Sequence, residues 1–223
     1  MCYFSLQVTV MRLRNIFLAL LILGAFPHPI YAQETAGEAE RTVESPSPDG
    51  RFAFLATRQP DGKKTFDLIK KNSGEVLLRV AESDADFGNR LTTAVLWTRD
   101  SKRFALNYSL VRLGEEVSVF FRRGGAFREL KLPKLPEARL PKLSASQRKH
   151  LWHISANNST GAVRWQKHGS LVVEIESSID GNSSFAKATR TVVLAFNRFG
   201  AVRIIKSAQE VNVHIEPKDP VLE

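Results

Sequence analysis

The chain has 223 residues, of which 43% are hydrophobic and 25% charged, and this composition excludes a largely disordered chain or a protein with many membrane spans. Its net charge is +9, but acids alternate with the basic residues, so no nucleic-acid partner is expected, whereas weak attraction to anionic envelope polymers or acidic partners is. The only cysteine is Cys2, within the N-terminal segment, which excludes disulfides, a thiol nucleophile and a cysteine zinc site from the rest of the chain.

Residues 1–32 have the pattern of a cleavable secretory signal peptide. A basic stretch begins at Met11, and Ile16–Phe26 is an apolar run of signal-peptide length, too short to span a membrane. Ala32 is a small residue before the expected cut, so the mature protein would begin at Gln33, without a lipid-modified cysteine and without a further membrane span. We expect a periplasmic or secreted protein. Translation from either Met1 or Met11 is open, as is an uncleaved N-terminal anchor.

After the leader, the sequence predicts a polar linker, a β domain and a tail. Residues 33–44 are polar and acidic without periodicity, which is typical of a disordered linker. The β domain is expected over 45–215, with blade-sized units at about 45–90, 91–132 and 160–206, and residues 216–223 are expected to form an unstructured tail. Hydrophobic residues alternate with polar ones at 51–57, 64–70, 75–80, 91–97, 104–110, 117–121, 127–132, 162–165, 170–176, 187–196 and 201–205.

The segment 133–158 interrupts this alternation. Its prolines exclude central strands, and residues 143–154 predict one short helix, so the segment is interpreted as an insertion or linker. The fold class is therefore all-β: antiparallel meander sheets with one short helical insertion.

Three places share a turn just before a strand. They are Ser-Pro-Asp-Gly-Arg-Phe at 47–52, Trp-Thr-Arg-Asp-Ser-Lys-Arg-Phe at 97–104 and Trp-Gln-Lys-His-Gly-Ser-Leu at 165–171. In such a turn an Asp side chain binds nearby backbone amides, Gly supplies the positive φ, and the apolar residue that follows enters the core. Asp49 and Asp100 are therefore expected to hold equivalent turns, with Trp97 and Phe104 buried beside the second.

The Ser-Pro-Asp-Gly-Arg sequence followed by an apolar strand resembles the repeat of bacterial β-propellers of the TolB and WD-repeat-like kind. The resemblance implies blade-like sheets. Three units are too few for a closed ring, so an incomplete or irregular ring is expected, and His168 replaces the Asp in the third unit. A good turn before a strand explains the same residues without a propeller. The resemblance implies a type of fold but no particular activity, because propellers include both enzymes and binding proteins.

No common catalytic signature is present, and no catalytic, cofactor-binding or metal-binding residue is predicted. His150 and His153 have a spacing that could bind a metal but lack a third ligand, and His168 and His214 are expected to be exposed.

Two pairs of acidic residues are also not predicted to form a site. Glu174 and Glu176 share one strand face and are interpreted as solvated, and Asp84 and Asp86 favour a plain turn over a weak calcium site.

The tryptophans and three glycosylation sequons are the remaining candidates for a functional site. Trp97 and Trp165 fit buried anchor positions better than an exposed sugar-stacking platform, for which Trp152 is the third candidate. The sequons at Asn107, Asn158 and Asn182 are interpreted as chance matches.

The function that these patterns favour is an exported, non-enzymatic binding or scaffold module whose partner is another protein or an envelope polymer. The alternative is an envelope hydrolase acting on a polysaccharide or peptide. A deep pocket joining Glu174 or Glu176 to a second carboxylate would favour the enzyme, and an apolar or aromatic patch would favour the binding module.

Overall fold

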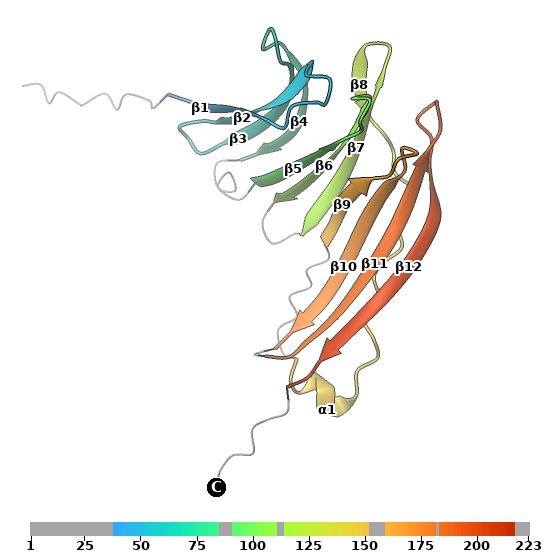
Figure 1. The fold of residues 1–223 in the computed structure, drawn as a ribbon. Helices are drawn as coiled ribbons and strands as arrows, with labels where there is room; N and C mark the ends of the chain where they lie inside the picture. Colours follow the sequence, from blue (N-terminus) through green and yellow to red (C-terminus); the bar gives the residue numbers. More distant parts are fainter. Residues whose placement is uncertain (1–37, 85–90, 111–113, 152–158, 182, 217–223) are drawn as a thin grey trace, which may run out of the picture. The chain divides into compact units, whose positions relative to one another are not determined.

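The structure is a computed structural model, and it describes residues 38–84, 91–110, 114–151, 159–181 and 183–216. These residues form three four-stranded antiparallel sheets, and the strands of each sheet lie in chain order (Figure 1). The first sheet contains β1 (Glu40–Glu44), β2 (Phe52–Arg58), β3 (Lys64–Lys70) and β4 (Val76–Ser83). The second contains β5 (Leu91–Trp97), β6 (Arg103–Leu110), β7 (Glu115–Arg123) and β8 (Ala126–Glu129). The third contains β9 (Ser159–Trp165), β10 (Leu171–Asp180), β11 (Phe185–Phe196) and β12 (Val202–His214). The protein is all-β, with blade-like meander sheets as the sequence predicts.

Two predicted boundaries differ from the structure. The linker prediction for 33–44 is wrong over Glu40–Glu44, which form β1 and pair with β2 along its whole length. The side chains of β1 are largely exposed, so backbone pairing holds the strand without a hydrophobic pattern in its sequence. The third sheet extends to His214, beyond the expected end at 206, because the edge strand β12 is also mostly exposed and pairs with β11 over its full length.

The helix is shorter than expected. Within the described part of the predicted range 143–154, α1 covers Ala145–Arg148, and its first turn has a capping box formed by Ser144 and Gln147. The preceding proline-containing segment is packed on the protein. Ala138 is buried, and Arg190 Nε donates to the carbonyl oxygen of Glu137 at 2.8 Å. The leucines of this segment, Leu132, Leu135 and Leu140, pack against the core of the third sheet.

The second sheet packs on both of its neighbours. Along β6, Phe104 and Leu106 belong to an aromatic core shared with the first sheet, whereas Ala105 belongs to the core shared with the third. This division follows from the period-two geometry of a strand, which sends successive side chains to opposite faces. Both faces of the second sheet are thus buried, as the continuous burial of residues 104–107 shows.

The two cores differ in chemistry. The core between the first and second sheets is aromatic, with the Phe54 ring stacked on Phe66 at 4.9 Å and packed edge-on against Phe104 at 5.1 Å. The core between the second and third sheets is aliphatic, and it is formed mainly by Ala105, Val119, Leu171, Val173, Ile175, Ala188, Val192 and Leu194. Aromatic pairs with these geometries stabilise a core beyond the area they bury.

Candidate functional site

The connection between the first and second strands of each sheet is a turn of one type, which we call a motif turn. The three motif turns are Ser47–Phe52, Thr98–Arg103 and Gln166–Ser170, and in each the first residue's amide donates to the last residue's carbonyl oxygen at 2.9, 2.9 and 2.8 Å. The residue with a left-handed backbone is Gly50, Ser101 and Gly169, with φ of 72°, 55° and 77°. The motif turns are therefore structurally equivalent, and the third is one residue shorter.

Asp49 and Asp100 play the same part in their turns, which confirms that prediction. Asp49 accepts from the Ser47 hydroxyl at 2.8 Å and from the Arg51 amide at 3.1 Å. Asp100 accepts from the Thr98 hydroxyl at 2.7 Å and from the Lys102 amide at 3.0 Å. A carboxylate held in this way stabilises the turn amides that would otherwise lack a partner.

Both carboxylates are kept ionised. Burial alone would raise the pKa of Asp49, but the Ser47 hydroxyl and the amide, side-chain hydrogen bond and charge of Arg51 lower it to about 2. Burial alone would also raise the pKa of Asp100. The Thr98 hydroxyl, the Lys102 amide and the nearby positive charges of Lys102 and Arg103 lower this pKa below its ordinary value.

Tryptophans join each motif turn to the one before it. Trp97 Nε1 donates to the carbonyl oxygen of Ser45 at 2.9 Å, and Trp165 Nε1 donates to that of Leu96 at 2.8 Å. Each tryptophan directly precedes its motif turn, and each acceptor lies two residues before the preceding motif turn. The same hydrogen bond is thus repeated between successive sheets, and Pro46 occupies the tryptophan position in the first unit.

A second contact joins the second and third sheets. The Asn107 side chain on β6 donates to the carbonyl oxygen of Ala162 at 2.9 Å and accepts from the Ala162 amide at 2.7 Å. Asn107 is 9% exposed, so the first sequon occupies a buried position with its amide group engaged. The sequons at Asn158 and Asn182 lie outside the described residues.

A groove of about 1050 Å³ lies between the second and third motif turns. Its apolar part comes from the ends of β5 and β9 and includes both tryptophans, and its polar part comes from the two turns and their neighbours. The lining residues are Pro48, Val95, Leu96, Trp97, Thr98, Arg99, Asp100, Arg103, Val163, Arg164, Trp165, Gln166, Lys167, His168 and Gly169. An apolar or aromatic patch is the feature that would favour a binding module over an enzyme, and this groove combines apolar residues with positive charge.

Arg103 is a half-buried residue in the lining of this groove. Its guanidinium carbon is 5.2 Å from the ring centre of Phe121 in the second sheet and 5.5 Å from that of Phe196 in the third. Its Nε is buried and makes no hydrogen bond within the described part of the chain. A Cβ added to Gly169 would be 3.1 Å from Arg103 Nη1, so the side chain reaches the third motif turn.

The groove is strongly positive. Arg99, Arg164 and Lys167 are exposed and, like Arg103, form no ion pair with another described residue. Among the described residues of the lining, Asp100 is the one carboxylate, and it is already bound to its own turn. Sequence reasoning missed this cluster because the cations are dispersed along the chain and meet only where two turns meet.

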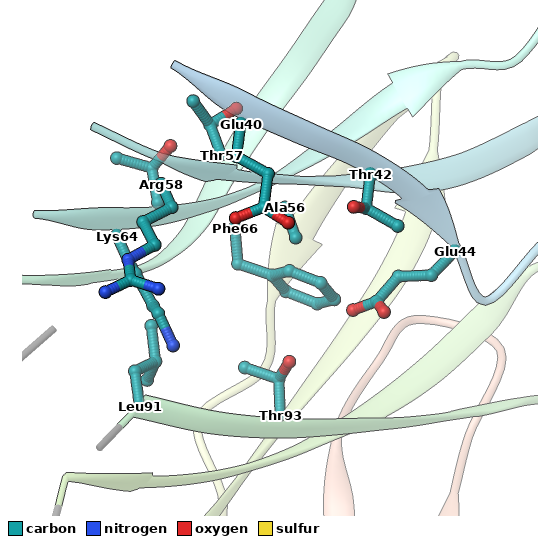
Figure 2. Close-up of a pocket in the computed structure, with 11 residues that line it drawn as sticks. Glu40, Thr42, Glu44, Ala56, Thr57, Arg58, Lys64, Phe66, Leu91 and Thr93 are labelled. Carbon is teal, nitrogen blue, oxygen red and sulfur yellow. The ribbon is translucent and has the colours of Figure 1, made fainter. Parts of the chain in front are cut away.

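A smaller cavity of about 270 Å³ is lined by β1, β2, β3 and β5 (Figure 2). Glu40 and Glu44 project into it from β1 around the Phe66 ring, with Arg58 and Lys64 at one end. The cavity therefore brings two acidic and two basic side chains to one edge of the first sheet.

The acidic pair predicted on β10 is also separate from both cavities. Glu174 is exposed, and Glu176 pairs with Lys187 at 2.6 Å on the strand face opposite Val173 and Ile175. The structure therefore places this pair on a solvated strand face.

The remaining candidates do not assemble into a site. His168 is exposed in the third motif turn, and His214 is exposed on β12. His153, Trp152 and Asp86 lie outside the described residues, and Asp84 is exposed. Across the described ranges, no three His, Cys, Asp or Glu side chains are placed to bind a metal ion.

Comparisons with known proteins give no family and a weak structural likeness. No protein-family model and no curated protein matches the chain. A crystal structure of an uncharacterized protein from Listeria monocytogenes EGD-e is similar at 10% identity and a TM-score of 0.32, over 72% of this chain and 55% of that one. Among the described residues, no helix has the length and apolar character needed to cross a membrane.

Proposed function

We propose that the protein is an exported, non-enzymatic binding module that holds a partner in the groove between the second and third motif turns. The observation that carries this proposal is the groove itself: about 1050 Å³ of space that joins an apolar floor to unpaired cations. Ligand sites commonly combine apolar walls with a few placed polar groups. The export signal of residues 1–32 and the resemblance to TolB-like propeller repeats support a role in the bacterial envelope.

Hydrogen bonds between successive sheets hold the residues of the groove in a fixed arrangement. Equivalent tryptophan hydrogen bonds and the Asn107 contact connect successive sheets, so the groove is formed by elements that are tied together. Binding to a preorganised surface loses less conformational entropy than binding to a mobile one. The described residues give the hydrolase less support, since Glu174 and Glu176 lie on a solvated strand face and Asp100 is bound within its own turn.

Affinity capture tests the proposal. The tagged protein is exported in its native host, recovered with its bound components from envelope extracts, and compared with an Arg99→Glu/Lys167→Glu variant. A Lys206→Glu variant is the matched control, because Lys206 is exposed on β12 and outside the groove. We expect one component that is captured by the wild-type protein and the control and lost from the groove variant. Capture of nothing, or equal capture by all three proteins, would contradict the proposal.

A further inference from the structure

The two successive interfaces between sheets differ at one equivalent position. Phe52 ends the first motif turn and Arg103 ends the second, as the matching hydrogen bonds from Ser47 and Thr98 show. Phe52 faces the second sheet, where its ring packs on Trp97 at 6.3 Å and on Phe127 at 5.2 Å. At this position the first interface contains a phenylalanine, with the Arg122 guanidinium carbon 4.9 Å from its ring centre, and the second contains an arginine beside an open groove.

The arginine is held in place by aromatic rings and forms no ion pair with a described residue. Phe121 and Phe196 contact its guanidinium from the second and third sheets, and Nε is buried between them. A guanidinium presents five donors in a fixed fork, which matches the two oxygens of a carboxylate. Phenylalanine rings satisfy the charge only in part, so the donors that reach the groove are available to an anion.

The surroundings select the kind of anion. Leu96 and Val163 give the groove an aliphatic floor, and Val163 is 38% exposed, whereas the Val95 side chain packs against the aromatic core. Exposed cations, Arg99 and Lys167 among them, come from the two motif turns. A peptide that alternates carboxylate and aliphatic side chains complements both features, whereas a sugar acid offers no aliphatic side chains for the floor.

We propose that the groove binds an acidic peptide segment of a partner protein, with Arg103 receiving a carboxylate and the aliphatic floor receiving a neighbouring apolar side chain. This inference rests on the proposed function and names its ligand class. The negative charge of Asp100 is outweighed in this lining by Arg99, Arg103, Arg164 and Lys167. The charge complementarity also implies binding that weakens as salt is added.

Fluorescence anisotropy with three labelled probes tests this proposal. The probes are a ten-residue peptide of alternating Glu and Leu, the same peptide with Gln for Glu, and an oligogalacturonate of equal charge. We expect the Glu peptide to bind at least about tenfold more tightly than the Gln peptide, the change expected for one charge-assisted hydrogen bond. The preference should fall sharply between ionic strengths of about 0.01 and about 1 M, where the Debye length drops from about 30 to about 3 Å.

Variants assign the effect to the groove. Arg103→Met keeps an aliphatic stem between Phe121 and Phe196 but removes the charge, and it should reduce the preference for Glu over Gln several-fold, leaving the smaller part that the other groove cations supply. Lys167→Glu, an exposed substitution, should weaken Glu-peptide binding with an unchanged unfolding midpoint, and Lys206→Glu should leave binding unchanged. The ratio between the two peptides separates a role in recognition from a role in packing.

The outcomes separate the two proposals. Tighter binding of oligogalacturonate than of the Glu peptide, equal binding of the Glu and Gln peptides, or equal weakening by Lys206→Glu would each overturn the acidic-peptide inference. Any of these results, together with a captured component that depends on Arg99 and Lys167, would leave the binding module standing. Failure of the capture experiment itself would overturn the proposed function.

Discussion

Truncation of Trp97 tests whether the motif turns hold the sheets together. The indole packs against Phe52, Phe54, Phe104 and Phe127, with ring centres 5.0–6.3 Å away, and donates a hydrogen bond to Ser45. Trp97→Ala removes both contributions and leaves a cavity, which costs about 3–5 kcal/mol for a buried tryptophan. Because Trp97 is only partly buried, the lower end of this range is expected.

Two further variants separate the contributions. Trp97→Phe keeps most of the ring contact but leaves the Ser45 carbonyl without its donor, so we expect a loss of about 1–2 kcal/mol. Asp100→Ala removes the bonds from Thr98 and Lys102 within one turn and should cost about 1 kcal/mol.

Denaturant unfolding of the four proteins, followed by circular dichroism, gives the midpoints and slopes needed for the comparison. The order of stability should be wild type, Asp100→Ala, Trp97→Phe and Trp97→Ala, with the middle two close together. A Trp97→Ala protein as stable as wild type would refute the reasoning, because it would show that the indole is a surface group and that the repeated hydrogen bond does not couple the sheets.

Other predictions follow from the same contacts. Folding lowers the pKa of Asp49 from 3.8 to about 2, so the ionised carboxylate stabilises the fold above about pH 4 and loses this effect as the pH falls through about 2. The difference in unfolding free energy between wild type and Asp49→Asn should therefore be on the order of 1 kcal/mol at neutral pH and vanish near pH 2. A difference that does not depend on pH would contradict this prediction. Gly50→Ala should cost about 1 kcal/mol in a chemical unfolding titration, because φ is 72° although no atom lies within 4 Å of the added Cβ. Asn107→Ala should cost about 2–3 kcal/mol by leaving the Ala162 amide and carbonyl unpaired, and an unchanged thermal midpoint would exclude that role. N-terminal sequencing of the exported protein should begin at Gln33, and recovery of residues 1–32 would show an uncleaved anchor.

Local patterns were sufficient to predict the strands and the turns. β3 and β5 lie at the predicted 64–70 and 91–97, because alternation of apolar and polar residues reports which face of a strand is buried. Asp49 and Asp100 hold equivalent turns, because an Asp binds amides within two residues of itself and needs no distant partner. Exposed edge strands gave no such signal, so β1 was mistaken for a linker.

The contacts between sheets were decided by the tertiary structure. Tryptophan before the second and third turns suggested burial, but its acceptor lies 52 or 69 residues away, a separation that no local pattern specifies. Arg103 looked like one more solvated cation after a turn. Only the packing of β7 and β11 places Phe121 and Phe196 around its guanidinium and brings Lys167 to the same groove. Sequence periodicity thus determined the strands and turns, whereas the candidate site depends on which sheet faces meet, because its charges come from segments far apart in the chain.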